Sequence, residues 1–487
     1  MKCNPFLLAD FYKVGHVFQY PPNTTKVYSN FTPRKSRLPG VEYIVFFGLQ
    51  YFIKEYLIQR FNEEFFSKPK ELAIQEYSEV VKAALGSDLP SYSHLSELHT
   101  LGHLPLYIKA LPEGTRVPIG VPCLTITNTL PEFYWLPNFV ETLLSSCLWQ
   151  MCTSATIAYQ YRMLLNHYAK ETGIPKDFVQ WQGHDFSFRG MSSPESAIMS
   201  GMGHLLSFSG TDTIPSIVAL KQYYGADYTK ELVGGSVPAT EHSVMSCGGF
   251  DTELDTYRRL LTEIYPSGIV SIVSDTWSLW EVCTDYMEIL KPEIMSRPGK
   301  LVIRPDSGDP VKILCGDPEA SSECVKRGVV QLLWDTFGGT TTEQGYKLLD
   351  SHIGVIYGDA ITIDRAREIC DRLKQKGFAS QCVFGIGSYT YQYNTRDTFG
   401  FAMKATYAMV GGVGVELWKD PVTDTGEKKS AKGLLRVIRN NDNVLRLEDC
   451  ITADQETTGL LEPVFKDGCL LRDQTFRDIK GILCGSE

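Results

Sequence analysis

Residues 301–310, LVIRPDSGDP, place a cation and a carboxylate directly after an apolar run that is typical of a buried strand. Pro305 and Gly308 predict that the strand ends in a loop. We therefore expect Arg304 and Asp306 at the C-terminal end of a strand, where α/β folds bind ligands. A planar guanidinium suits a phosphate group, and a nearby carboxylate suits sugar hydroxyls or Mg²⁺. A surface turn with an incidental ion pair explains this stretch equally well when it is taken alone.

A histidine with a neighbouring acid follows in the segment SVPATEHSV, where Glu241 precedes His242. A histidine in a polar, proline-containing loop can act as a base, a phosphate acceptor or a ligand. The competing interpretation is a loop histidine that only makes backbone hydrogen bonds, and for this segment alone it is the more common case.

Two further motifs offer groups that could hold a flat polar molecule. In GHDFSFRG, residues 183–190, a strand would point Phe186 and Phe188 to one face, beside Arg189. Aromatic rings are more often core residues, yet Phe186 stands among charged groups, which favours a stacking role. Asp212 in SGTDT either caps a helix or accepts a hydrogen bond from an amide NH₂ or a protonated ring nitrogen.

A basic segment follows near the C-terminus. It contains Arg396, Lys404, Lys419, Lys428, Lys429 and Lys432. Such a run is usually a solvated face, but in an acidic protein it can also hold a polyphosphate.

The composition limits the function classes. The 487 residues include 47 Lys and Arg against 57 Asp and Glu, and this net charge of −10 argues against a general nucleic-acid binder. The 13 cysteines show no Cys-x-x-Cys pair and no zinc spacing, so we expect free thiols in a reducing cytoplasm.

The N-terminal residues do not resemble a signal peptide, and the uncharged stretch between Glu141 and Arg162 is too polar for a membrane span. That stretch is expected to form a buried helix.

Familiar cofactor signatures are absent from the sequence. Neither Gly385-Ile-Gly387 nor Gly412-Val-Gly414 has the third glycine of a dinucleotide fingerprint, and no P-loop or nucleophile elbow occurs. The sequence therefore gives no sign of NAD as a redox cofactor.

The elements that must position these residues change in character near residue 150. Residues 1–35 look irregular; helices are expected at 46–61 and 62–85, and strands at 106–111, 117–120 and 123–128. Later strands are expected at 178–182, 270–273, 301–303, 354–357, 382–384 and 409–417, with helices at 157–171, 196–208, 216–224 and 365–376. Alternating strands and helices predict parallel βαβ units, with all of the polar loops on one face. An α/β barrel is favoured over a doubly wound open sheet.

We expect three segments. Residues 1–150 form an α+β part, residues 151–396 a barrel-like α/β domain, and residues 397–487 a segment that packs back on the first part and contributes basic interface residues.

Taken together, the motifs resemble the nicotinamide phosphoribosyltransferase family, whose members are type II phosphoribosyltransferases. The matching motifs are HDFSFRG, SGTDT, SVPATEHS, IVSDT, IRPDSGDP, YGDAI, TRD at 395–397, WKDP at 418–421, and the N-terminal DFYKVGH and QYPPNT. The match covers nearly the whole chain and is weakest at 35–45, 60–100 and 430–487.

The resemblance implies an irregular α/β barrel with a second α+β domain built from both chain ends, in a homodimer with shared active sites. It also implies that the enzyme joins nicotinamide to 5-phosphoribosyl-1-pyrophosphate, giving nicotinamide mononucleotide and pyrophosphate. Mg²⁺ is implied as a cofactor, and ATP hydrolysis as a coupled reaction through a phosphohistidine. No membrane or nucleic-acid partner is implied.

The resemblance also implies roles for individual residues. Phe186 is implied to lie on one face of the nicotinamide ring, and Tyr12 of the partner subunit on the other. Asp212 is implied to hold the carboxamide, with Arg189 beside it. Around the sugar and its phosphate the implied residues are Arg304, Asp306, Gly358, Asp359, Gly387 and Ser388. His242 is the implied phosphorylated residue, with Glu241 and Asp275 adjacent. The residues implied to hold pyrophosphate or ATP phosphates are Arg34, Arg396, Lys404, Lys419 and Lys428. No residues are assigned to the metal.

Two alternatives stay open: a nicotinate phosphoribosyltransferase, and an inactive binding protein on the same scaffold. Asp212 favours the amide substrate, because a second carboxylate would be repelled. The chain also departs from the family pattern at the loop 385–389 and at Ala402, where side chains replace glycine and a serine is missing.

Overall fold

The computed structural model describes residues 3–419 and 431–485, in two compact units. The first unit comprises residues 1–156, 218–226 and 394–487, and the second comprises residues 157–217 and 227–393. Both chain ends therefore belong to the first unit. The chain passes between the units after Thr156, Ile217, Ala226 and Tyr393.

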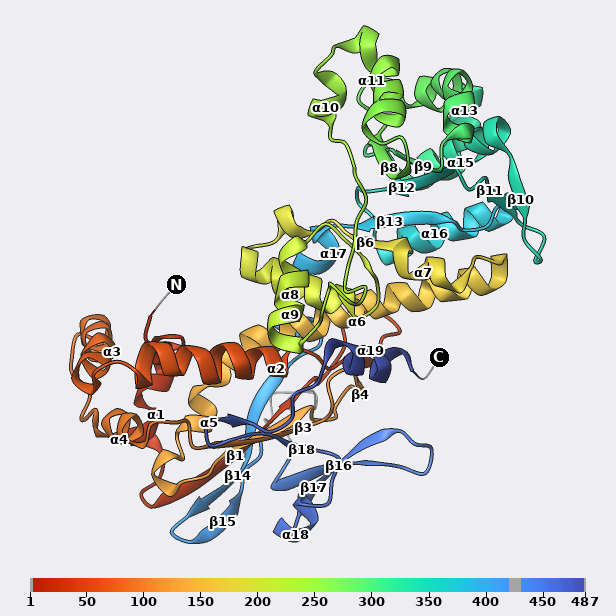
Figure 1. Cartoon of the computed structure of the whole chain (residues 1–487). Coiled ribbons are helices and arrows are strands. Elements are labelled where there is room, and N and C mark those ends of the chain that lie inside the picture. The colour runs from red at the N-terminus through yellow and green to blue at the C-terminus, as the bar shows by residue number, and fades with distance from the viewer. Residues whose placement is uncertain (1–2, 420–430, 486–487) are drawn as a thin grey trace. The chain divides into compact units, whose positions relative to one another are not determined.

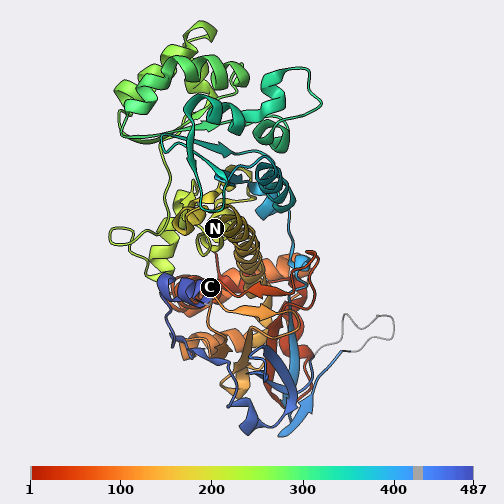
Figure 2. The same cartoon turned by 90° about the vertical axis from the view of Figure 1, so that its right-hand side faces the viewer.

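A seven-stranded antiparallel sheet forms the centre of the first unit, in the order β15-β14-β1-β5-β3-β18-β19 (Figure 1). These strands are β1 (Thr24–Thr32), β3 (Leu106–Ala110), β5 (Leu124–Asn128), β14 (Ala402–Val410), β15 (Val413–Glu416), β18 (Glu462–Lys466) and β19 (Cys469–Leu470). Strands from the start of the chain thus lie beside strands from its end, as Figure 2 shows after a 90° turn.

Two expectations for this unit are wrong. Residues 1–35 are not wholly irregular, because β1 pairs on both sides, with β14 and β5, and buries Val27 and Phe31. Residues 409–417 are not one strand but parts of the hairpin β14–β15. Its turn is made by Gly411 and Gly412, whose φ angles of +58° and +79° suit glycine.

Smaller elements complete the first unit. The remaining strands are β2 (Tyr43–Val45), β4 (Arg116–Pro118), β16 (Leu434–Arg439) and β17 (Leu445–Ile451). Its helices are α1 (His16–Gln19), α2 (Leu49–Phe52), α3 (Lys70–Leu85), α4 (Ser93–Leu101), α5 (Leu136–Phe139), α18 (Ala453–Glu456) and α19 (Phe476–Cys484). Helices α6 (Glu141–Thr172) and α9 (Ile214–Tyr224) contribute residues to both units.

The second unit contains a six-stranded parallel sheet in the order β7-β6-β13-β12-β9-β8. The strands are β6 (Gly183–Asp185), β7 (Gly210–Thr211), β8 (Gly268–Val273), β9 (Gly299–Arg304), β12 (Ile353–Tyr357) and β13 (Cys382–Ile386). A separate two-stranded sheet consists of β10 (Gly339–Thr341) and β11 (Lys347–Leu349).

The parallel sheet closes on itself. The last strand of this sheet in chain order, β13, pairs with the first, β6. The open edges β7 and β8 are bridged by residues 235–240, here called the closing segment, through the pairs Gly210–Gly235 and Ala239–Ser271. The strands therefore follow one another around a barrel in chain order, which confirms the expected irregular α/β barrel and excludes the doubly wound sheet.

Helices occupy the connections between the barrel strands. They are α8 (Pro194–Leu205), α10 (His242–Ser246), α11 (Glu253–Arg259), α12 (Leu279–Glu281), α13 (Met287–Ser296), α14 (Pro310–Cys315), α15 (Glu323–Phe337) and α16 (Ile363–Gln375), whereas α7 (Lys176–Gln182) precedes β6 and α17 (Ser388–Gln392) follows β13. The strand expected at 178–182 is wrong. These residues form α7, which buries Val179 and Gln182 on one helical face, and the strand begins only at Gly183.

The structure also describes the cysteines and the uncharged stretch that follows Glu141. All 13 cysteines are free. Among the described residues, none of the helices combines the length and apolarity that a membrane crossing requires. The uncharged stretch after Glu141 lies in α6, where Thr153, Ser154 and Thr156 are buried.

Candidate functional site

The polar loops predicted to cluster do so, because each follows the C-terminal end of a barrel strand. Phe186 follows β6, Asp212 follows β7, Asp275 follows β8, Arg304 ends β9 and Asp306 follows it, Gly358 and Asp359 follow β12, and Gly387 and Ser388 follow β13. In a parallel barrel these ends share one face. The alternative interpretation of residues 301–310, a surface turn with an incidental ion pair, is therefore not supported.

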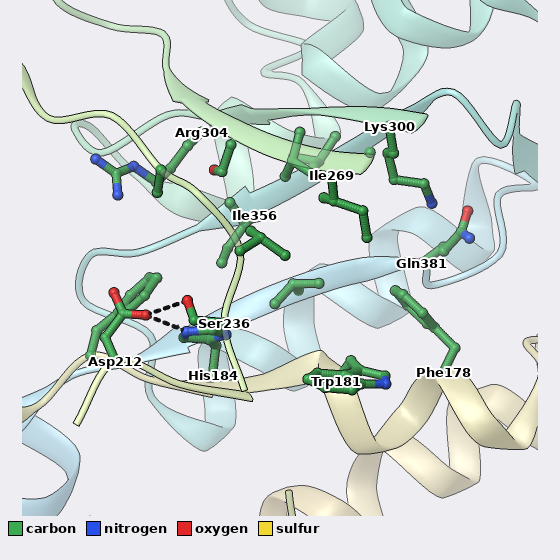
Figure 3. A pocket seen from close by; sticks show the side chains of 18 residues that line it. Phe178, Trp181, His184, Asp212, Ser236, Ile269, Lys300, Arg304, Ile356 and Gln381 are labelled. Carbon is green, nitrogen blue, oxygen red and sulfur yellow. Dashed lines mark hydrogen bonds and ion pairs between the residues drawn. The ribbon is translucent and has the colours of Figure 1, made fainter. Parts of the chain in front are cut away.

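A cavity of about 310 Å³ runs inside the barrel. Figure 3 shows Asp212, Ser236, His184 and Arg304 at one end, and Lys300, Gln381 and Phe178 at the other. The middle is lined by aliphatic side chains of β8, β9, β12 and β13. The end at the C-terminal strand termini, here called the polar end, carries Asp212 and Arg304, and the opposite end carries Lys300 and Gln381. The polar end and the apolar middle together suit a small aromatic molecule with one polar substituent.

Asp212 is held by two donors at the polar end of the cavity. Its Oδ1 lies 2.8 Å from His184 Nε2 and accepts a hydrogen bond from Ser236 Oγ at 2.7 Å (Figure 3). Burial alone would raise the pKa of Asp212, but the hydrogen bonds and charge of His184, Ser236 and Arg304 lower it overall. The side chain is therefore a fixed carboxylate, and it is 48% exposed.

The half-buried ring of Phe186 packs closely against the backbone at two glycines, Gly385 and Gly358. A Cβ at Gly385 would stand 2.3 Å from its ring, and a Cβ at Gly358 would stand 3.3 Å from it. On the other side, the rings of Phe186 and His184 are 4.7 Å apart and tilted by 51°. Phe188 does not share this face, because the strand ends at Asp185 and Phe188 lies exposed in a 3₁₀ turn with Arg189.

Arg304 connects the end of β9 to the closing segment. Its Nη2 donates to the carbonyl oxygen of Thr240 at 2.8 Å, and its backbone N–H donates to Ser274 Oγ at 3.3 Å. Within the described residues its Nε is buried without a hydrogen-bond partner. A buried guanidinium N–H of this kind is costly unless a ligand or water occupies it, so Arg304 is a strong candidate for anion binding.

His242 meets the sugar-phosphate loop through Asp275. Asp275 Oδ1 lies 3.2 Å from His242 Nε2, while Oδ2 accepts the backbone N–H of Asp306 at 3.0 Å and the hydroxyl of Ser307. The His242 side chain is half-exposed, whereas that of Asp275 is only 6% exposed. Glu241 accepts a hydrogen bond from the hydroxyl of Ser243.

The loops after β12 and β13 present backbone to the same face. A Cβ at Gly358 would lie 3.0 Å from Asp306 Oδ1, so these two loops touch. Asp359 is exposed beside Ala360, whose φ of +54° is unusual for a residue with a side chain. At the departure from the family pattern, Ser388 packs against Gly190, while Gly387 faces open space.

The described residues implied for pyrophosphate and ATP, which are Arg34, Arg396, Lys404 and Lys419, belong to the first unit. Arg34 Nε donates to Gly400 O at 3.1 Å, and Lys404 lies on β14 beside Asn30 of β1. Burial lowers the pKa of Lys404, and the positive charges of Arg34, Lys419 and Lys13 lower it further, against the effect of Glu141. This unit therefore gathers basic residues that lie hundreds of positions apart in the sequence.

Four other sequence-predicted residues are placed as follows. Arg396 is exposed beside Asp397, and Ala402 is buried at the start of β14. Tyr12 is 61% exposed, in a 3₁₀ helix at Phe11–Gly15. Lys428 lies outside the described residues.

No cluster of three metal-ligating side chains occurs in the part of the chain that the structure describes. Mg²⁺ is usually bound by one or two carboxylates together with substrate phosphates, and so needs no such cluster. Asp306 and Asp359, on touching loops, are suitable carboxylates for a cation shared with a phosphate.

Sequence reasoning missed several residues that hold the site together: His184, Ser236, Thr240, Ser274 and Tyr357. All five stand within motifs that the sequence analysis names, and the place of His184 near a strand end was a usable signal. The closing segment that carries Ser236 and Thr240 has no strand-like pattern, so its position beside Asp212 and Arg304 could not be read from the sequence.

Comparison with known proteins identifies the family. Residues 4–108 match the model of the nicotinamide phosphoribosyltransferase N-terminal domain, and residues 181–469 match that of the nicotinate phosphoribosyltransferase (NAPRTase) family. Nicotinamide phosphoribosyltransferase of Acinetobacter baylyi is 52% identical over 98% of this chain and 97% of its own length. The chain belongs to the nicotinamide phosphoribosyltransferase family. As a member of this family it is an enzyme of the phosphoribosyltransferase class.

Solved structures support the same fold. A nicotinate-nucleotide pyrophosphorylase from Pyrococcus furiosus matches 99% of this chain and 95% of its own with a TM-score of 0.61 at 14% identity. Human nicotinic acid phosphoribosyltransferase matches 98% of this chain and 93% of its own with a TM-score of 0.56 at 15% identity. At these identities the likeness concerns the fold, which agrees with the type II phosphoribosyltransferase barrel expected for the nicotinamide phosphoribosyltransferase family.

Proposed function

We propose that this enzyme transfers the 5-phosphoribosyl group of 5-phosphoribosyl-1-pyrophosphate to nicotinamide, giving nicotinamide mononucleotide and pyrophosphate in NAD salvage. The observation that carries this proposal is the fixed carboxylate of Asp212 at the polar end of the cavity, with a lowered pKa. An ionised carboxylate accepts a hydrogen bond from the carboxamide NH₂ of nicotinamide, and it repels the carboxylate of nicotinate. Family membership supports the same reaction class.

The chemistry that these residues perform is mainly positioning and charge stabilisation. Phe186 stacks on the pyridine ring while Asp212 orients the amide, so that the ring nitrogen faces the sugar. As the bond to pyrophosphate breaks, positive charge develops on the ribose, and the carboxylates of Asp306 and Asp359 stabilise it. Arg304 binds phosphate through its buried Nε, which has no hydrogen-bond partner among the described residues. When bound, Mg²⁺ would neutralise charge on the leaving pyrophosphate, held by those carboxylates and the substrate.

We further propose that ATP hydrolysis is coupled to this reaction through His242. An imidazole nitrogen of His242 takes the γ-phosphoryl group, ADP leaves, and water later releases phosphate. Support comes from the position of His242, which is accessible and is oriented by the nearly buried carboxylate of Asp275. Arg34, Lys404 and Lys419 would bind the phosphates of ATP or pyrophosphate.

A homodimer with shared sites is part of the proposal, with Tyr12 of the partner subunit on the second face of the pyridine ring. The 61% exposure of Tyr12 leaves its ring accessible for such a role. A cytoplasmic location is proposed because 13 free cysteines suit a reducing compartment.

The second candidate is a nicotinate phosphoribosyltransferase, which the match to the NAPRTase family model favours. One assay separates the possibilities: purified protein with phosphoribosyl pyrophosphate and Mg²⁺, given nicotinamide or nicotinate, with and without ATP. We expect mononucleotide to form from nicotinamide with a kcat/KM at least tenfold higher than that for nicotinate. ATP should increase the rate. Preference for nicotinate would overturn the substrate assignment, and absence of both products would favour an inactive binding protein.

A further inference from the structure

Tyr357 joins the end of one barrel strand to the loop that follows its neighbour. It is the last residue of β12 and is fully buried, and β12 pairs with β9. Its hydroxyl donates a hydrogen bond to the carbonyl oxygen of Gly308 at 2.9 Å. Gly308 has a φ of +89°, so this bond is made to the apex of a turn that requires glycine.

The loop that receives this bond is the one that carries Asp306. Asp275 holds its first part, by accepting the backbone N–H of Asp306 and the hydroxyl of Ser307. Asp309 holds its last part, by capping α14 through the backbone N–H groups of residues 311 and 312 at 2.9 and 3.1 Å. Tyr357 holds the middle of the loop through its hydrogen bond to Gly308, which as a glycine has the most freely rotating backbone.

The anchor also acts on the contact between two loops of the site. Gly358, which follows Tyr357 directly, lies so close to Asp306 that a Cβ there would stand 3.0 Å from Asp306 Oδ1. A shift of the Gly308 turn would change this contact. Burial, followed by the negative charges of Asp359, Asp275, Asp306 and Asp309, raises the pKa of Tyr357. The phenol therefore stays protonated and remains a donor throughout the working pH range.

We propose that Tyr357 is a positioning residue for phosphoribosyl pyrophosphate, whose hydroxyl fixes the turn at Gly308 so that Asp306 is held against Gly358. This inference rests on the proposed function and assigns Tyr357 to the sugar-phosphate half of the site. The opposite half, where Asp212 lies, is held by His184 and Ser236, whereas the Tyr357 hydroxyl donates to Gly308. A tyrosine that served only to fill the core would need no hydroxyl.

The test is Tyr357→Phe, which keeps the buried ring and removes only the hydroxyl. A neutral hydrogen bond contributes a few-fold to roughly tenfold in an equilibrium constant, so the KM for phosphoribosyl pyrophosphate should rise about three- to tenfold. The KM for nicotinamide should change by less than about twofold, because Asp212 has other anchors. Backbone hydrogen exchange in residues 304–310 should become faster, which reports the loop independently of turnover.

Tyr168→Phe is the matched control, because Tyr168 is also buried in the second unit and its hydroxyl donates to Asp371 Oδ1 at 2.6 Å, between α6 and α16. It should leave both KM values and the exchange of residues 304–310 unchanged. If Tyr357→Phe raises both KM values equally, or alters neither KM nor exchange beyond the control, the positioning role is wrong. If the wild-type protein forms no mononucleotide, the proposed function fails instead, and the exchange experiment still decides whether Tyr357 holds the loop.

Discussion

His242 Nε2 lies 3.2 Å from Asp275 Oδ1, and the other oxygen of the same carboxylate holds the backbone of Asp306. One side chain thus contacts both the candidate phosphate acceptor and the loop proposed to bind the sugar. Because Asp275 is nearly buried and His242 is half-exposed, the carboxylate is the fixed member of the pair. A charge change on His242 therefore acts directly on a group that positions the phosphoribosyl site, which offers a physical route for coupling ATP hydrolysis to transfer.

Replacing His242 with alanine tests the phosphate-acceptor role. His242→Ala should abolish most of the ATP-dependent increase in rate and retain transfer without ATP, because no contact of the imidazole with the nicotinamide residues exists among those described. Initial rates of mononucleotide formation with and without ATP provide the measurement. Equal loss under both conditions would contradict a phosphohistidine.

Replacing Asp275 gives a different pattern from replacing His242. Asp275→Asn turns one acceptor oxygen into an NH₂ group, which must face either the imidazole or the N–H of Asp306. Losing the hydrogen bond to Asp306 should lower the basal rate by roughly tenfold, and the ATP response should fall as well. The comparison of basal rates in the two variants is the measurement; an Asp275→Asn protein with a normal basal rate would show that the loop does not depend on this carboxylate.

Asp212 is predicted to select the amide substrate. Asp212→Asn removes the negative charge and keeps the shape, so nicotinamide should lose its preference over nicotinate by about tenfold or more in kcat/KM. Competition between the two substrates at equal concentration measures this ratio directly. Unchanged preference would remove Asp212 from the amide site.

The lowered pKa of Asp212 also fixes the direction of a pH effect. Because the folded state favours the carboxylate, its contribution to stability and to nicotinamide binding is complete above the ordinary Asp pKa of about 3.9 and is lost only as pH falls through the lower folded value. The KM for nicotinamide should therefore stay constant between about pH 8 and pH 5 with respect to this group. A rise in KM centred near pH 6 would indicate that another group controls binding.

The sequence allowed the face of the barrel to be predicted, because strand–loop–helix units place their polar loops together whatever the exact boundaries are. Arg304, Asp306 and Asp275 were found next to strand ends for this reason. No strand was expected before Asp212, because β7 has only two residues and leaves no pattern in the sequence. The strand at 178–182 failed because its aromatic residues suit a strand and a half-buried helix equally well. Only packing decides between them, and here it buries Val179 and Gln182.

The contacts that fix the site could not be predicted from the sequence. The pairing of His184 with Asp212 depends on β6 lying beside β7. Ser236 lies near the same carboxylate because isolated β-bridges at Gly235 and Ala239 hold the closing segment in place, and the sequence of that segment has no periodic pattern. The bond from Tyr357 to Gly308 depends on the neighbouring positions of β12 and β9. Each of these contacts joins residues from different strands or loops, so strand order had to be known first.

The loop after β12 contains a strained residue that can be tested by stability. Ala360 has a φ of +54°, and its carbonyl oxygen accepts a hydrogen bond from Arg365 Nη1 at 2.6 Å. A side chain in the left-handed region costs roughly 1–2 kcal/mol, while glycine loses about 0.4–1 kcal/mol through the greater freedom of the unfolded chain. Ala360→Gly should therefore stabilise the protein by about 0.5–1 kcal/mol, measured from the midpoint of urea unfolding.

The matched control for Ala360→Gly is Ala366→Gly, a few residues later in the same connection. Ala366 is buried in α16, where the backbone is right-handed and no strain is relieved. There the same substitution should destabilise the protein by about 1 kcal/mol or more, from lost helix propensity and a lost methyl contact. Opposite signs for the two variants would establish that backbone strain is stored beside Asp359. Destabilisation by both would mean that the Ala360 side chain makes contacts that outweigh the cost of its conformation.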